Sequence, residues 1–77
     1  MDIFYSKQAR KFLEKQETVA EERIKKAVEK LPEGDVVKMS GYDNRYRLRV
    51  GGFRIVFTKE NGGIYVRIIE NRGQVYK

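Results

Sequence analysis

Residues 45–58, Arg-Tyr-Arg-Leu-Arg-Val-Gly-Gly-Phe-Arg-Ile-Val-Phe-Thr, constrain the fold more than any other stretch. Apolar and basic residues alternate on both sides of a Gly-Gly pair, a pattern typical of a β-hairpin with a two-residue turn. Side chains alternate between the two faces of a strand, so one face, the core face, is apolar and carries Tyr46, Leu48, Val50, Phe53, Ile55 and Phe57. The opposite face, the arginine face, carries Arg45, Arg47, Arg49 and Arg54.

The same register places Arg49 directly opposite Arg54. Like charges across a strand pair are destabilising, whereas convergent guanidinium groups on a rigid sheet suit a phosphate ligand. Two interpretations are open. The arginines form either a solvated face that keeps strands from aggregating or a ligand site, and the Arg49–Arg54 pair favours the site.

Composition narrows the possible functions. The 77 residues predict a single domain, 1–77, with neither cysteine nor histidine, so disulfides, thiolate zinc sites and the usual general base are excluded. We expect no metal and no cofactor. No stretch approaches the roughly 18 apolar residues of a membrane span, and we expect a cytoplasmic protein. The formal charge of +6 indicates an anionic partner such as nucleic acid.

The N-terminal half predicts one short strand and two helices. Residues 2–5 are typical of an edge strand, and Ser6 is a candidate N-cap for a helix over 7–16. Residues 18–21 fit a capping box that would open a second helix. The apolar stripe of that helix consists of Ala20, Ile24, Ala27, Val28 and Leu31.

The remainder predicts strands. A strand over 36–39 precedes the central hairpin, and a second turn lies at either Asn61-Gly62 or Gly62-Gly63 before a last strand over 64–69. Both turns place Ile64, Val66 and Ile68 on the core face, and Tyr65, Arg67 and Ile69 on the arginine face. The fold class is therefore α+β: an N-terminal strand, then a two-helix hairpin packed on one face of a four- to five-stranded, mainly antiparallel sheet.

Further side chains could bind RNA beside the arginine face. Single-stranded RNA exposes phosphates and unstacked bases, which arginines and aromatic rings bind. The candidates for stacking are Tyr42, Tyr65 and Tyr76, and those for RNA binding in general are Arg45, Arg67, Lys38 and Tyr65.

Two segments, 46–57 (Tyr-Arg-Leu-Arg-Val-Gly-Gly-Phe-Arg-Ile-Val-Phe) and 71–76 (Asn-Arg-Gly-Gln-Val-Tyr), resemble the RelE/ParE superfamily of bacterial and archaeal toxins. The order of predicted elements matches as well, so the resemblance covers essentially the whole chain. It implies a type II toxin that enters the ribosomal A site and cleaves mRNA by attack of a 2′-hydroxyl on the adjacent phosphodiester, without metal. It also implies a cognate antitoxin, whose acidic or disordered segment would suit the basic surface.

The resemblance also implies catalytic positions, which are Arg47, Arg49, Arg54, Arg72 and Tyr76. The sequence departs from the family where other members have lysines, at Arg47 and Arg49, and where some have a histidine, at Asn71. A guanidinium cannot lose its proton, so no strong general base is evident. Tyr76 and Glu70 are the candidates to replace it.

Two other functions stay open. A toxin like ParE would inhibit DNA gyrase without cleaving RNA, and a catalytically degenerate relative would be a basic RNA- or protein-binding module. Mapping transcripts after induction separates the nuclease from the gyrase inhibitor, and overexpression of a binding module should leave translation untouched.

Overall fold

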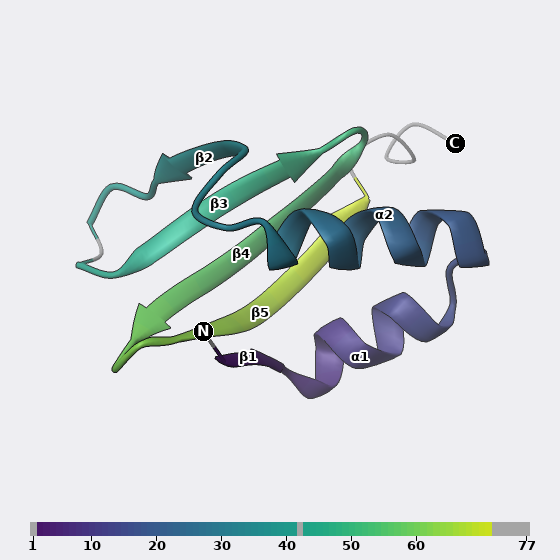
Figure 1. The fold of residues 1–77 in the computed structure, drawn as a ribbon, viewed down its shortest axis with the longest axis horizontal. Coiled ribbons are helices and arrows are strands. Elements are labelled where there is room, and N and C mark those ends of the chain that lie inside the picture. Colours follow the sequence, from purple (N-terminus) through teal and green to yellow (C-terminus); the bar gives the residue numbers. More distant parts are fainter. Residues whose placement is uncertain (1, 42, 72–77) are drawn as a thin grey trace.

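A five-stranded sheet with two helices on one of its faces makes up residues 2–41 and 43–71, which the computed structural model describes (Figure 1). The elements are β1 (Asp2–Tyr5), α1 (Lys7–Glu14), α2 (Thr18–Glu29), β2 (Asp35–Lys38), β3 (Arg45–Val50), β4 (Phe53–Glu60) and β5 (Gly63–Asn71). The strand order is β1-β5-β4-β3-β2, and all neighbours are antiparallel except β1 and β5. The predicted fold class is confirmed.

The two helices begin differently. Ser6 caps α1 as predicted, because its Oγ accepts a hydrogen bond from the backbone N–H of Ala9 at 3.0 Å. The predicted capping box of α2 is wrong: Glu17 is the N-cap, and its side chain makes no capping hydrogen bond. The stripe of α2 is confirmed, since Ile24 and Val28 are buried.

Both hairpin turns follow their sequence signals. In the first, Val50 pairs with Phe53, so the predicted register of β3 and β4 is confirmed. In the second, Glu60 pairs with Gly63, which leaves Asn61-Gly62 as the turn. The φ angles of 48° at Asn61 and 78° at Gly62 are those of a type I′ turn, which asparagine and glycine favour.

A β-bulge in β5 overturns part of the predicted face assignment. Val56 pairs with Ile68 and Phe57 with Val66, so Arg67 is the extra residue between them. Beyond the bulge every side chain changes face. Ile69 is therefore 1% exposed in the core and Ile68 is 42% exposed on the arginine face, the reverse of the prediction.

Helix α1 supports β5 at this bulge. The pairing of β1 with β5 ends at Tyr5 and Val66. Past that point, Ser6 Oγ donates to the carbonyl of Arg67 at 2.6 Å, and the amide of Gln8 both donates to Ile69 O and accepts from Ile69 N–H. These side chains satisfy backbone groups of β5 that have no neighbouring strand on that side.

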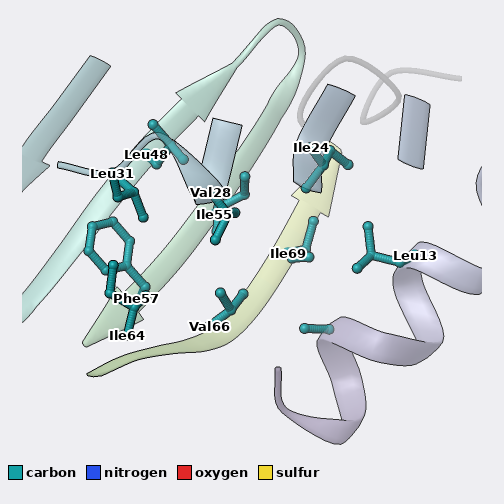
Figure 2. Packing of buried hydrophobic residues seen from close by; sticks show 11 residues of the cluster. Leu13, Ile24, Val28, Leu31, Leu48, Ile55, Phe57, Ile64, Val66 and Ile69 are labelled. Atoms are coloured by element: carbon teal, nitrogen blue, oxygen red, sulfur yellow. The ribbon is translucent and has the colours of Figure 1, made fainter. Parts of the chain in front are cut away.

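The core lies between the sheet and the helices (Figure 2). It consists of Ala9, Leu13, Ile24, Val28, Leu31, Leu48, Ile55, Phe57, Ile64, Val66 and Ile69. Both helices cover the core face, and no described helix covers the arginine face (Figure 1). The candidate site is therefore built on strands that the core holds rigid from behind.

Candidate nucleic-acid interface

Residues on the arginine face form three rows that run across the strands. The charged row is Asp35, Arg49, Arg54 and Glu70. The middle row is Val37, Arg47, Val56 and Ile68. The aromatic row is Phe4, Tyr65, Thr58 and Arg45.

In the charged row an acidic residue stands at each end. Arg54 Nη2 lies 2.9 Å from Glu70 Oε2, and Asp35 is the register partner of Arg49 without an ion pair between them. The two carboxylates offset the repulsion between Arg49 and Arg54. The sequence alone predicts this repulsion but not the carboxylates that relieve it. Without the bulge the register would place Ile69 opposite Arg54, so the bulge produces the Arg54–Glu70 pair.

The middle row contains Arg47, whose guanidinium lacks hydrogen-bond partners among the described residues. Val56 is 5% exposed although no described helix covers it, which places it beneath the stems of its long neighbours. The side chain of Arg47 makes no hydrogen bond or ion pair with any other residue of 2–41 and 43–71, and its Nε is buried without a partner. The Nε of Arg54 is likewise buried and unpaired among those residues. Arg47 can therefore turn towards a phosphate oxygen without breaking a bond of its own.

Arg49 is the second arginine with freedom to bind. It is exposed and has no ion pair within the described ranges. A guanidinium is a permanent cation with five donors in a planar fork, which fits two phosphate oxygens at once. Arg47, Arg49 and Arg54 thus form a cationic group that can hold an anion but cannot act as a general base.

In the aromatic row, the sequence predicted the role of Tyr65 and Arg45 but not that of Phe4. The rings of Phe4 and Tyr65 are stacked, with centroids 4.9 Å apart. Arg67 donates to Thr58 Oγ1 at 3.2 Å and to Glu60 Oε2 at 3.3 Å, and its guanidinium lies over the Tyr65 ring. Sequence reasoning missed Phe4, for which the only signal was a large aromatic residue in a short edge strand.

The other candidates do not all meet at this face. Lys38 pairs with Tyr46 and therefore lies on the core-face side, away from the arginines. Arg45 stands at the end of the aromatic row as expected. Three candidates, Tyr42, Arg72 and Tyr76, lie outside the described residues.

A groove of about 630 Å³ lies on the other side of the sheet, between α2 and the β2–β3 pair. Its apolar lining includes Val19, Ala27, Leu48 and Val50. Its charged lining is mixed and consists of Arg23, Lys26, Lys30 and Arg49 together with Glu22, Glu33 and Asp35.

Two further properties of the described residues bear on metal binding and membrane insertion. Residues 2–41 and 43–71 contain no group of three or more acidic, histidine or cysteine side chains arranged to hold a metal ion. Neither α1 nor α2 has the length and apolar composition that crossing a membrane requires.

Comparison with solved structures gives two close matches in fold. A chain of the RelB-RelE antitoxin-toxin complex from Methanococcus jannaschii superposes with a TM-score of 0.76 at 28% identity, covering 95% of this chain and 94% of that one. A chain of the archaeal RelE-RelB complex from Pyrococcus horikoshii OT3 also gives 0.76, at 22% identity, covering 96% and 97%. No family model and no curated protein matches. The chain thus has a RelE-like fold over nearly its whole length, which supports its assignment to the RelE-like toxins of the RelE/ParE superfamily.

Proposed function

We propose that this chain is the toxin of a type II toxin–antitoxin pair and a ribosome-dependent mRNA endoribonuclease. The observation that carries the proposal is the arginine face itself. On a sheet with the RelE-like fold, Arg47 and Arg49 lack ion-pair partners among the described residues and lie beside Arg54, on the side that no described helix covers.

In this proposal the arginines act by binding and by charge. Arg47 and Arg49 hold the phosphate next to the scissile bond, and Arg54 stabilises the charge that develops as the 2′-hydroxyl attacks. The bond from the 2′-oxygen to phosphorus forms and the bond to the 5′-oxygen breaks, which leaves a 2′,3′-cyclic phosphate and a 5′-hydroxyl. Arg72 and Tyr76 remain predictions from the resemblance.

The partner is proposed to be a cognate antitoxin with an acidic segment. The net charge of +6 favours such a segment. Two surfaces suit it: the arginine face, whose charge it would neutralise, and the groove beside α2, whose apolar lining and basic residues fit an amphipathic helix. Antitoxin bound at the arginine face competes with RNA, and antitoxin bound in the groove also meets Arg49, which lines it.

The test is induction of the chain in a bacterium, followed by primer-extension mapping of 5′ ends on abundant transcripts. We expect new 5′ ends within translated regions for the native chain and for Arg10→Ala, an arginine on α1 on the opposite side of the sheet. We expect none for Arg49→Ala. Arg49 is a cleaner target than Arg54, whose removal also leaves Glu70 without its partner.

Other results would point elsewhere. Growth arrest without new 5′ ends, together with inhibited DNA supercoiling, would support the gyrase-inhibiting alternative. Unaltered growth and translation with well-expressed protein would support a degenerate binding module. Cleavage that survives Arg49→Ala unchanged would contradict the site proposed here.

A further inference from the structure

Three side chains form a continuous stack at the β1 edge of the arginine face. Phe4 and Tyr65 are register partners, and their rings are nearly parallel, with an angle of 18° between planes. The guanidinium carbon of Arg67 lies 5.3 Å from the centroid of the Tyr65 ring. The stack therefore runs from Phe4 through Tyr65 to Arg67.

The described residues leave one ring face of this stack open, and it belongs to Phe4. Arg67 is held towards β4 by its hydrogen bonds to Thr58 and Glu60, whereas Phe4 comes from β1 on the other side of β5. Tyr65 is thus covered from both sides. Phe4 is 49% exposed, and β1 is the outermost strand of the described sheet, so the second face of its ring points to the open edge.

The position of the Phe4 ring fits the path of a single-stranded nucleic acid bound by the arginines. Phe4 and the arginines of β3 and β4 lie on the same face of the sheet. Three strand spacings separate β1 from β3, which is about 14 Å at roughly 4.8 Å per strand. A single-stranded nucleic acid bound at Arg47 and Arg54 that continues across the strands reaches Phe4 within a few nucleotides.

Packing alone gives a weaker account of the ring. Cross-strand aromatic pairs do stabilise sheets, but a large exposed aromatic side chain on an outer strand invites strand-to-strand association. Among residues 2–41 and 43–71, the other large exposed apolar side chains are Val19, Val37 and Ile68, none of which has a ring on which a base can stack.

We infer that Phe4, supported from behind by Tyr65, is the platform on which one base of the bound single-stranded RNA stacks. The inference rests on the proposed function, because it requires RNA at the arginine face. Stacking on an aromatic face tolerates every base, so the platform adds affinity and positions the strand without selecting a sequence.

The experiment measures binding of the full chain to a short single-stranded RNA whose 2′-hydroxyls are methylated, which prevents cleavage. A single 2-aminopurine, walked along the probe, loses fluorescence where it stacks on an aromatic ring. We expect one position to be quenched by the native chain, and Phe4→Leu to abolish that quenching and weaken binding by about 5- to 100-fold. Replacing that base by an abasic nucleotide should weaken the native chain but leave Phe4→Leu unaffected.

A matched control and a rescue complete the design. Val19→Ala removes an exposed apolar side chain from α2, on the other side of the sheet, and it should bind RNA like the native chain. Phe4→Trp should restore stacking. The chain has no native tryptophan, so the introduced indole also reports the site alone, and its fluorescence should fall when RNA binds.

The outcomes separate the two claims. If Phe4→Leu binds like the native chain while Arg47→Ala weakens binding, the platform is wrong and the RNA site stands. If the native chain does not bind the probe, both fall. If Phe4→Leu does not fold, Phe4→Trp decides: an indole whose fluorescence is unchanged on saturation with RNA overturns the platform.

Discussion

The two faces of the sheet are built from the same strands, but the side chains of one face are packed in the core while donors on the other face lack partners. Ile55 and Arg54 are neighbours in β4, yet Ile55 is fully buried among apolar side chains, while Arg54 keeps an unpaired Nε among the described residues. The core face packs its apolar side chains against the two helices. The arginine face has donors that its own described fold does not use, so we expect substitutions on the two faces to separate stability from activity.

The largest effect should come from the core face. Phe57→Ala removes a side chain that is fully buried at the centre of the sheet, and the cost should be about 3–5 kcal/mol. That is much of the stability of a small domain, typically about 5–15 kcal/mol. Urea unfolding followed by circular dichroism measures it, and a loss below about 1 kcal/mol would contradict the packing described here.

The next effect should appear in activity without a matching loss of stability. Arg47→Ala should lower the rate of RNA cleavage by about 100-fold or more, as loss of one positioned donor does. Unfolding should shift by only about 1 kcal/mol, because the lost stem uncovers Val56. Single-turnover cleavage on programmed ribosomes gives the first value and urea unfolding the second. Equal losses in Arg47→Ala and in the Arg10→Ala control would remove the distinction between the arginine face and the rest of the basic surface.

A smaller effect on RNA binding should come from the Glu70 end of the charged row. Glu70→Gln releases Arg54 from its carboxylate and should tighten binding of the methylated RNA by up to about fivefold, since an exposed ion pair is worth about 0.2–1 kcal/mol. The salt dependence should steepen by about one phosphate contact. Anisotropy titrations at several salt concentrations measure both, and weaker binding would mean that Glu70 positions Arg54 for RNA instead of competing for it.

The smallest effect concerns the edge of the core. Burial, and secondarily the charge of Glu29, raise the pKa of Tyr5 above its ordinary value of 10.0. Above pH 10 the unfolded chain therefore loses this proton before the folded chain does, and stability falls as pH rises further. Tyr5→Phe should lose less stability than the native chain between neutral pH and pH 11, measured by urea unfolding. Identical alkaline profiles would contradict the raised pKa.

Local signals predicted most of the fold. The Gly-Gly turn fixes the register of β3 and β4, and with it the Arg49–Arg54 pair, because a two-residue turn leaves one pairing that keeps the core face apolar. The signals for the N-cap Ser6 and for the apolar stripe of α2 also lie within a few residues of the structure that they predict. The capping box failed because α2 begins one residue earlier than predicted, so Thr18 is the first residue of the helix and not its N-cap.

The features that the sequence did not reveal depend on pairing between strands that are far apart in the chain. A bulge adds one residue to a strand without changing its composition, so strict alternation assigned Ile68 and Ile69 to the wrong faces and missed the contact of Arg54 with Glu70. The stack of Phe4 on Tyr65 arises from a parallel pairing between the first and last described strands, which no turn signal marks.

The most direct test of the central claim is an NMR titration of the isotope-labelled chain with the methylated single-stranded RNA, following backbone amides and arginine Nε–H groups. We predict that the shifts concentrate on β3 and β4 around Arg47, Arg49 and Arg54, extend to Phe4, and leave α1 and α2 unchanged. Shifts confined to the groove beside α2, or none at saturating RNA, would contradict the claim that the arginine face binds RNA.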